Sequence, residues 1–262
     1  MIKHIGNITK KQIATEWDLV ADKREQLIQS NSDISLLYVT EPFVAKCLNL
    51  IPGKNVLDCG CGSGHLSALI AKFDRNVTAI DISGKSINIA EKKYNHIKNI
   101  RFYRHSIEDH SKLGFRYDLC ISNMVFMDVF NIEEVMSSIY NILNENGYLC
   151  FSITHPCFWP IYAGYFDSEW FKYNSEICIS APLIINKRTI GTTTHFHRPL
   201  EQYISLCQSA GFKIELIEEL YPYSINDDVN YKYEYPRFLG IVCQKKQERS
   251  IKHNQIENRH RV

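Results

Sequence analysis

The chain has 262 residues, of which 45% are apolar and 23% are charged, a composition that is ordinary for a globular protein. No apolar run approaches the roughly 18 residues that a membrane-spanning helix needs, and the amino terminus lacks the apolar core of a secretory signal, so we expect a cytoplasmic protein. The formal net charge of +1 argues against a surface committed to nucleic acid.

Nine cysteines are scattered along the chain, an odd number with no C-x-x-C pair and no His/Cys cluster at zinc spacing. Most of them stand inside apolar runs, where a free thiol behaves as a small buried hydrophobe. Cys59 and Cys61 lie inside a glycine-rich loop, which is a poor place for a zinc ligand. We therefore predict free cysteines and no metal site.

The first 50 residues predict a helical cap that precedes the main domain. Residues 8–29 place apolar side chains at helical spacing, and a polar break at residues 30–33 leads to a second helical region. The inward-facing candidates of the first helix are Ile13, Trp17, Val20 and Leu27.

Residues 55–64 read Asn-Val-Leu-Asp-Cys-Gly-Cys-Gly-Ser-Gly and are followed by an apolar pattern of helical period. This order predicts a strand, a tight glycine loop and a helix, which together form a nucleotide-binding unit. Glycines are needed where the backbone approaches a ligand closely or requires a positive φ. The dinucleotide pattern G-x-G-x-x-G fails, because the third glycine comes one residue early.

Strands and helices then alternate regularly, which predicts a parallel sheet with helices on both faces and ligands beyond the carboxyl ends of its strands. The predicted strands cover residues 55–59, 76–81, 99–104, 117–122, 147–154, 212–220 and 237–243. The predicted helices cover residues 64–73, 84–95, 131–143 and 199–210. We therefore predict an α/β fold with a Rossmann-like, seven-stranded, mostly parallel sheet.

With Asp58 before the glycine loop and Asp81 ending the next strand, the chain resembles the class I S-adenosylmethionine-dependent methyltransferases. In that family the loop wraps the methionine part of the cofactor, and the acid after the second strand binds the ribose hydroxyls. The resemblance implies S-adenosylmethionine as cofactor. The candidate cofactor-binding residues are Asp58, Gly60, Cys61, Gly62, Gly64, Asp81, Ile82, Ser106, Ile107 and Asn123.

Two loops depart from the best-known family patterns. Ser106 stands where the family usually has an acid that holds the adenine amino group, so Ser106, the backbone of Ile107 or Glu108 would make that contact. The loop from Asn123 onward lacks the [N/D]-P-P-[Y/F] signature of enzymes that methylate exocyclic amines of bases or glutamine. This absence argues against DNA or protein glutamine as the acceptor.

Two histidines are the catalytic candidates. His155 follows the fifth strand and is held by Pro156, where a general base could face the acceptor, although a histidine in a turn is more often structural. His197 and Arg198 belong to an H-R-P element that the resemblance places near the acceptor. Arg198 either binds an acceptor carboxylate or pairs with an acid such as Glu201 or Glu218.

Eight aromatic residues crowd into positions 158–173 without a clear period, which predicts an irregular lid at about residues 155–196. The lid continues into a β-hairpin formed by residues 177–185 and 189–196. Its rings could line an acceptor pocket, form a satellite core or make a dimer contact. The substrate-binding candidates are Trp17, Trp159, Tyr162, Tyr165 and Arg198.

These segments divide the chain into a cap at residues 1–50, a methyltransferase domain at 51–244 that contains the lid, and a tail at 245–262 with a net charge of +4. We expect the tail to be disordered, with RNA contact as the minority interpretation. The loop at residues 221–236 carries five tyrosines and is a second candidate wall of the acceptor site.

The sequence predicts in-line transfer of a methyl group to an oxygen or nitrogen of a small metabolite. Such a displacement mainly requires alignment of donor and acceptor, which fits the absence of a catalytic triad, a carboxylate pair or a metal cluster. Two alternatives remain open: methylation of RNA or protein by the same cofactor site, and a non-catalytic protein that binds S-adenosylmethionine.

Overall fold

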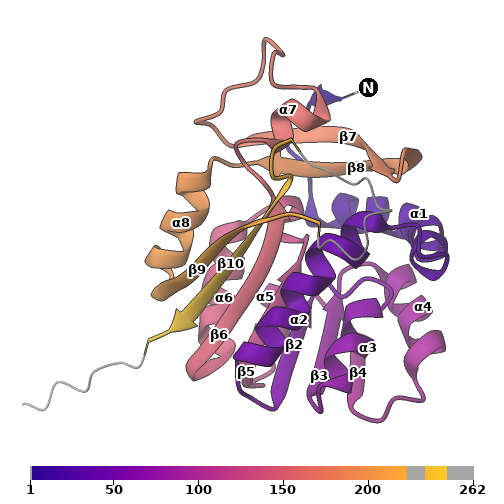
Figure 1. The fold of residues 1–262 in the computed structure, drawn as a ribbon, viewed down its shortest axis with the longest axis vertical. Coiled ribbons are helices and arrows are strands. Elements are labelled where there is room, and N and C mark those ends of the chain that lie inside the picture. The colour runs from indigo at the N-terminus through magenta and orange to yellow at the C-terminus, as the bar shows by residue number, and fades with distance from the viewer. Residues whose placement is uncertain (1, 223–233, 247–262) are drawn as a thin grey trace, which may run out of the picture.

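The computed structural model describes residues 2–222 and 234–246. Its larger sheet has seven strands in the order β4-β3-β2-β5-β6-β10-β9, and all neighbours are parallel except the pairs that include β10 (Figure 1). Strand order reverses between β2 and β5, which is where ligands bind in open α/β sheets. The strands are β2 (Asn55–Cys59), β3 (Asn76–Asp81), β4 (Ile100–Arg104), β5 (Tyr117–Asn123), β6 (Leu143–Thr154), β9 (Phe212–Leu220) and β10 (Phe238–Lys245).

Helices cover both faces of this sheet, as the alternation of elements predicted. Helices α2 (Glu41–Leu50), α3 (His65–Lys72) and α4 (Gly84–Tyr94) pack on one face. Helices α5 (Ile107–Ser111), α6 (Ile132–Ile142) and α8 (Leu200–Ser209) pack on the other. Successive residues of a strand point to opposite faces of the sheet. Val56 therefore packs in the core under α2, α3 and α4, and Leu57 packs in the core under α5, α6 and α8.

A second, smaller sheet lies above the carboxyl ends of the larger one (Figure 1). It joins β7 (Ile177–Ile185) to β8 (Arg188–His197) as the predicted hairpin, and β1 (Lys3–His4) adds an antiparallel edge strand to β7. A strand of two residues has no periodicity to detect, so this pairing was not predicted. The amino terminus therefore takes part in the inserted sheet as well as in the cap.

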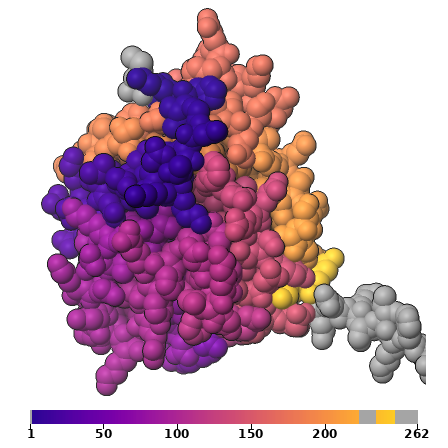
Figure 2. Space-filling view, turned by 180° about the vertical axis from the view of Figure 1, so that it is seen from behind, coloured from indigo at the N-terminus to yellow at the C-terminus, as the bar shows by residue number. Residues whose placement is uncertain are grey.

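Helix α1 (Lys10–Gln29) lies between the two sheets, and Figure 2 shows it within the indigo band that separates the inserted segment from the main domain. Thr9 begins the helix with a capping box that is closed by Gln12. The predicted inward positions Ile13, Val20 and Leu27 are buried. Their contacts join α1 to β8 through Phe196 and Ile190.

Most predicted boundaries agree with the structure to within one or two residues, and the differences are local. Short helices were missed at α5 and at α7 (Trp159–Ala163), which occupies part of the segment predicted to be irregular. A π-helical segment, η1 (Leu36–Thr40), precedes α2, and a 3₁₀ turn, η2 (Phe126–Asp128), follows β5. The predictions for residues 223–233 and 247–262 lie outside the described residues.

Lys245 corrects the predicted start of the tail. It belongs to β10, and its Nζ atom donates to the carbonyls of Tyr140 and Leu143 at 3.1 and 3.0 Å. These two carbonyls lie near the end of α6, where a cation is favourable. The side chain therefore holds the last strand against α6.

The cysteines are free, as the sequence predicted. All nine thiols are free, and each is buried except Cys157 and Cys178. Within the described ranges no helix is long and apolar enough to cross a bilayer.

Candidate functional site

The glycine loop follows β2 and is held against β3 by its own backbone. The N–H groups of Gly60 and Cys61 both donate to the carbonyl of Ile80, at 2.8 and 2.9 Å. Gly60 has φ = 76°, and a Cβ atom there would lie 2.3 Å from a methyl carbon of Val125. Gly62 has φ = 54°, but an added Cβ would meet nothing within 4 Å. The loop thus fits tightly against its own chain at Gly60 and borders open space at Gly62.

Asp81 ends β3 and fixes the loop from the neighbouring strand. One carboxylate oxygen accepts the Gly62 N–H at 2.8 Å, and the other accepts the Ser83 N–H at 2.8 Å. Desolvation raises the pKa of this carboxyl group, and the backbone N–H groups of Ser83, Gly62 and Ile82 oppose the rise. A carboxylate has about four lone-pair positions, so Asp81 can still accept two further hydrogen bonds from a ligand.

Asp58, at the end of β2, is almost inaccessible to solvent, with 2% of its surface exposed. Its carboxylate accepts a hydrogen bond from the Ser67 hydroxyl of α3 at 2.5 Å. Burial raises the pKa of Asp58 to about 7, although the Ser67 hydrogen bond acts in the opposite direction. A buried, unpaired acid at the edge of the loop is suited to bind a cationic group of a ligand.

Two acidic residues of α1 attach this helix to the loops after β2 and β3. Glu25 accepts hydrogen bonds from Ser63 of the glycine loop and from the Lys93 ammonium group, the latter at 2.7 Å. Asp18 accepts from the Ser83 hydroxyl at 2.6 Å and from the N–H of Lys85 at 2.9 Å. Helix α1 therefore covers the edge of the sheet at which these two loops lie.

The remaining predicted cofactor contacts lie at the same edge. Ser106 caps α5 by accepting the Asp109 N–H at 3.2 Å, while Ile107 is buried in the first turn of that helix. Glu108, the alternative adenine contact, pairs with Lys10 at 2.8 Å. Asn123 ends β5 and accepts the Ser152 hydroxyl at 2.7 Å.

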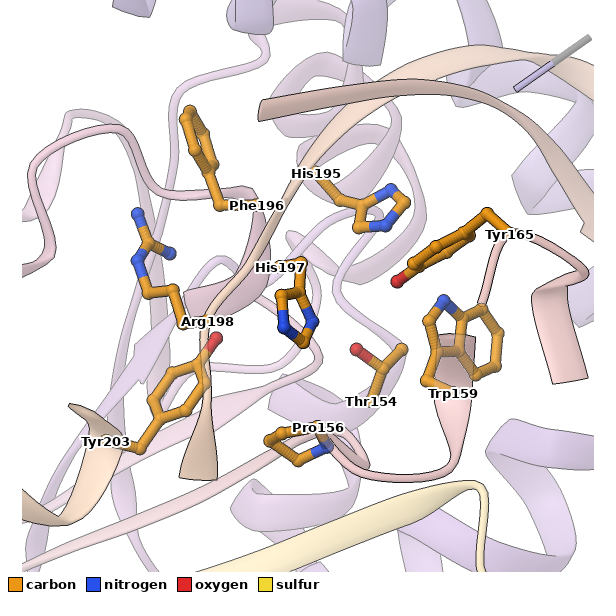
Figure 3. Close-up of a pocket in the computed structure, with 9 residues that line it drawn as sticks. All are labelled: Thr154, Pro156, Trp159, Tyr165, His195, Phe196, His197, Arg198 and Tyr203. Atoms are coloured by element: carbon orange, nitrogen blue, oxygen red, sulfur yellow. The ribbon is translucent and has the colours of Figure 1, made fainter. Parts of the chain in front are cut away.

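Beyond the end of β6, a second cavity lies under β8 (Figure 3). Its volume is about 10 Å³, room for about one water molecule, and its lining combines aromatic rings with imidazole and hydroxyl groups. The lining residues are Thr154, Pro156, Trp159, Tyr165, His195, Phe196, His197, Arg198 and Tyr203. The cavity thus brings the lid, the hairpin and α8 together at one place.

Arg198 serves the fold rather than an open site. It is 1% exposed, and its guanidinium group donates to the carbonyls of Phe126 and Val129 at 3.0 and 2.7 Å. Its Nε atom pairs with Glu176 at 2.7 Å, which corrects the predicted partners, since neither Glu201 nor Glu218 makes this contact. Glu218 pairs instead with Lys46. The structural alternative for Arg198 is therefore the one observed.

The two predicted catalytic histidines have partners within the chain. His155 accepts the Cys157 N–H through Nδ1 at 3.2 Å, and its Nε2 lies 3.5 Å from the Glu219 carboxylate. His197 lines the cavity, but its Nε2 is hydrogen-bonded to the carbonyl of Tyr173 at 2.9 Å. Burial lowers the pKa of both imidazoles, against the raising effects of Glu219 and Tyr173 respectively.

The predicted substrate residues separate into two groups. Trp159 and Tyr165 line the cavity together with His197 and Arg198. Tyr162 is 53% exposed and stacks with the Arg237 guanidinium, whose carbon lies 3.7 Å from the ring centroid. Trp17 extends from α1 and packs against an apolar cluster that contains Ile82 and Phe196.

Sequence reasoning did not select His195, whose Nε2 atom is buried without a hydrogen-bond partner. His195 and His197 are two residues apart on β8 and therefore face the same side, as Figure 3 shows. The sequence shows that His195 and His197 lie on the same face of the strand. It does not show which face of the hairpin packs toward the domain.

Residues 50–182, which include the glycine loop, β2 to β6 and the start of the hairpin, match a family model described as a methyltransferase domain. The chain belongs to this methyltransferase family. S-adenosylmethionine, which the resemblance to the family implied, is its cofactor.

Individual relatives support the same family. The chain is 31% identical to a malonyl-[acyl-carrier protein] O-methyltransferase of Bacillus cereus over 113 residues, which cover 42% of this chain and 41% of that protein. It is 29% identical to a mitochondrial ubiquinone biosynthesis O-methyltransferase of Schizosaccharomyces pombe over 154 residues, which cover 58% and 53%. The chain thus spans about half or less of the length of these relatives.

The fold is shared with solved methyltransferases. An S-adenosylmethionine-dependent methyltransferase from Mesorhizobium loti aligns with a TM-score of 0.59 and 21% identity, over 78% of this chain and 96% of the other. Likeness at this identity concerns the fold alone.

The residues of this chain fit the family's cofactor in three respects. Open space at Gly62 lets a ligand approach the backbone, and Asp81 retains lone pairs that could accept two hydroxyl donors. Asp58 adds a buried carboxylate beside the loop, where it could bind the amino group of a methionine moiety.

The raised pKa of Asp58 predicts a pH dependence of stability. The folded state holds a proton up to about pH 7, whereas an aspartate in the unfolded chain releases it near pH 4. Its contribution is therefore fully present below pH 4 and is lost as the pH rises to 7. Urea denaturation should show the unfolding free energy, relative to that of Asp58→Asn, falling by about 2 kcal/mol between pH 5 and pH 7.

The exposed aspartate Asp167, in the inserted segment, supplies the matched control. Asp167→Asn should leave the pH dependence of the wild-type protein unchanged. If the difference in unfolding free energy between wild type and Asp58→Asn were the same at both pH values, the raised pKa of Asp58 would be contradicted.

Proposed function

We propose that the chain is a methyltransferase that transfers a methyl group from S-adenosylmethionine to an oxygen or nitrogen of a small metabolite. When bound, the cofactor supplies an electrophilic methyl group on a sulfonium centre. The proposal is carried by one observation: aromatic side chains gather under β8 at the same edge of the sheet as the glycine loop and Asp81.

The cofactor side of the proposal assigns a role to each loop. Asp81 would bind the ribose hydroxyls, and Asp58, Gly60, Cys61, Gly62 and Gly64 would hold the methionine part. Ile82, Ser106 and Ile107 would border the adenine, and Asn123 would lie beneath the cofactor. The family assignment and the free lone pairs of Asp81 support these roles.

The proposed acceptor site rests on the aromatic side chains that would surround the acceptor. Trp159 and Tyr165 supply rigid ring faces, and the inserted sheet lies above them (Figure 3). Ring faces gathered at this edge of the sheet suit a small acceptor, whereas a folded RNA or protein substrate would need an open surface. His155 and His197 remain candidates for orienting the acceptor, and both would do so as neutral imidazoles because burial lowers their pKa values.

The test begins with calorimetry against S-adenosylhomocysteine and, separately, NADH. Binding of the first at micromolar concentration and none of the second is the expected result. The protein is then incubated with a tritiated methyl donor and three pools: metabolites below about 1 kDa, total RNA and unfolded protein. Label should enter the metabolite pool.

Deletion of residues 247–262 separates the alternatives, because this cut removes most of the basic tail but keeps Lys245 in β10. Undiminished labelling of metabolites by the shortened chain is expected. Label that enters only RNA or protein, or that disappears with the deletion, would overturn the small-molecule assignment. Tight cofactor binding with no labelled product in any pool would favour a non-catalytic binding protein.

A further inference from the structure

We propose that Asp128 binds the amino group of the methyl acceptor and takes up the proton that this group loses during methyl transfer. The inference rests on the proposed function and deepens it, because it makes the acceptor an amine and adds a catalytic residue. Asp128 belongs to the 3₁₀ turn η2, which follows β5 at the carboxyl edge of the larger sheet.

The first argument is the place of Asp128 in the sheet. Strands β3 and β5 lie on either side of β2, and the glycine loop follows β2. Asp81 ends β3, whereas Asp128 lies in the turn after β5, so the two acids stand on opposite sides of the glycine loop. Because Asp81 is assigned to the cofactor's ribose, Asp128 lies on the side of the loop that remains for the methyl acceptor.

The second argument is that the Asp128 carboxylate has no partner. The other residues of η2, Phe126 and Met127, are buried in the core under α6, whereas the Asp128 side chain stays partly exposed. Among the described residues its carboxylate makes no hydrogen bond and no ion pair, yet burial raises its pKa well above the ordinary value. A carboxylate that solvent still reaches, although protein surrounds most of it, lies in a crevice. Asp81 combines the same partial exposure with a raised pKa.

The third argument is that the turn is fixed around the acid. Arg198 donates to the backbone carbonyls before and after Asp128 and does not pair with the carboxylate itself. Met124 has φ = 59°, a conformation that is rare outside glycine and that is concentrated at functional sites. Its N–H donates to the carbonyl and the hydroxyl of Ser152 at 2.9 and 3.2 Å. The backbone thus holds an unpartnered carboxylate in one place, as a binding group requires.

The fourth argument is charge. The groups that act on the carboxylate come from three elements: Glu16 of α1, Arg198 directly after β8, and Tyr203 of α8. Burial raises the pKa of Tyr203 to about 12, so the phenol is uncharged at neutral pH. Arg198 forms an ion pair with Glu176 at 2.7 Å, which offsets its charge. The negative charges of Asp128 and Glu16 are therefore in excess, and they favour a cationic ligand that donates hydrogen bonds, such as an ammonium group.

The reaction balances with Asp128 as the proton acceptor. The amine enters as an ammonium ion, and the carboxylate takes one N–H proton from it. The nitrogen lone pair then forms the N–C bond, while the C–S bond of the donor breaks and its electron pair stays on sulfur. The products are a methylammonium ion, S-adenosylhomocysteine and the Asp128 carboxylic acid, which releases its proton to water. A hydroxyl acceptor would instead develop negative charge beside Glu16, which is unfavourable.

The first experiment identifies the methylated atom. The metabolite pool is incubated with the full chain and a trideuterated methyl donor, and each labelled product is fragmented by tandem mass spectrometry. The label should reside on nitrogen. Label on oxygen or carbon would overturn the inference and leave the methyltransferase assignment intact. If no small metabolite is labelled, the proposed function fails, and the inference fails with it.

The second experiment compares variants. Asp128→Asn should lower the rate of metabolite labelling at pH 7 at least about 100-fold, as expected for loss of a general base, and should bind S-adenosylhomocysteine within about threefold of wild type. Its residual rate should rise about tenfold per pH unit up to about pH 9, because only the neutral fraction of the amine then reacts. Glu133→Gln, at an exposed acid in the first turn of α6, is the matched control and should label at the wild-type rate.

A third readout does not depend on activity. An unpaired carboxylate whose pKa is raised by burial destabilises the folded state at neutral pH, so Asp128→Asn should melt at or above the wild-type temperature. A melting temperature lowered by more than about 3 °C would show that Asp128 serves the fold and would overturn the inference. Labelling by Asp128→Asn at the wild-type rate, or a residual rate that does not rise with pH, would overturn it as well.

Discussion

Replacement of Asp81 by asparagine should weaken S-adenosylhomocysteine binding at least about 100-fold, a loss of about 2.7 kcal/mol. The Asp81 carboxylate accepts the N–H groups of Gly62 and Ser83, and its remaining lone pairs are the proposed acceptors for the ribose hydroxyls. An asparagine would turn an NH₂ group toward one of these donors and would lose the charge-assisted bonds, each worth about 1.5–3 kcal/mol. Calorimetry at neutral pH measures the effect.

Asp74→Asn is the matched control. Asp74 lies in the turn before β3 with φ = 57°, a conformation that asparagine also tolerates, and its carboxylate pairs with Lys54 at the surface. This variant should bind S-adenosylhomocysteine with wild-type affinity. An Asp81→Asn protein that stays folded and binds within about threefold of wild type would show that the ribose contact lies elsewhere.

The parallel sheet could be predicted from the sequence because its strands are short apolar runs that end at turn residues. Residues 55–59 and 76–81 were placed with the observed boundaries, since Gly60 and Ile82-Ser83 mark where each strand must stop. Helix α5 was missed although Ser106 and Asp109 form a recognisable cap, because five residues are too few for a periodic pattern. The pairing of β1 with β7 depends on contacts between segments more than 170 residues apart, which no local pattern encodes.

The glycine loop and Asp81 could be located from the sequence and the arrangement of the hairpin could not, for a physical reason. Glycines and an acid at fixed spacing are required by backbone geometry, so they leave a local signature in the sequence. Acceptor contacts depend on how the hairpin turns over the sheet: His197 was selected and His195 was not, although both face the cavity. Arg198 binds mainly backbone carbonyls. Every residue has a backbone carbonyl, so the sequence could not show which residues Arg198 would contact.

Helix α1 links the two sides. Glu16 accepts the N–H and hydroxyl of Thr194, the residue before His195, at 2.7 and 3.0 Å. Nine residues further along the same helix, Glu25 accepts from Ser63 in the glycine loop. The helix therefore has hydrogen bonds to both the cofactor loop and the cavity wall, so a change in its position would alter both sites together.

Replacement of Arg198 by methionine should lower the free energy of unfolding by about 3–5 kcal/mol, the cost of removing one partner from a buried ionic network. The side chain would leave the carbonyls of Phe126 and Val129 without their donors and Glu176 without its cation. It would also remove the positive charge that opposes the burial-raised pKa of Asp128. Thermal unfolding should shift downward by about 10 °C, and Arg198→Lys should recover only part of this, because a single ammonium group cannot replace the planar fork.

Arg188, at the exposed start of the same strand, provides the comparison: Arg188→Met should change stability by less than about 0.5 kcal/mol. Folded Arg198→Met protein should still bind S-adenosylhomocysteine within about threefold of wild type, since Gly62 and Asp81 make no contact with this arginine. Loss of cofactor binding at a temperature where the variant remains folded would mean that Arg198 also supports the cofactor loop. A stability loss below about 1 kcal/mol would mean that water or another donor replaces the guanidinium at these carbonyls, and that the hairpin is held to η2 mainly by its apolar contacts.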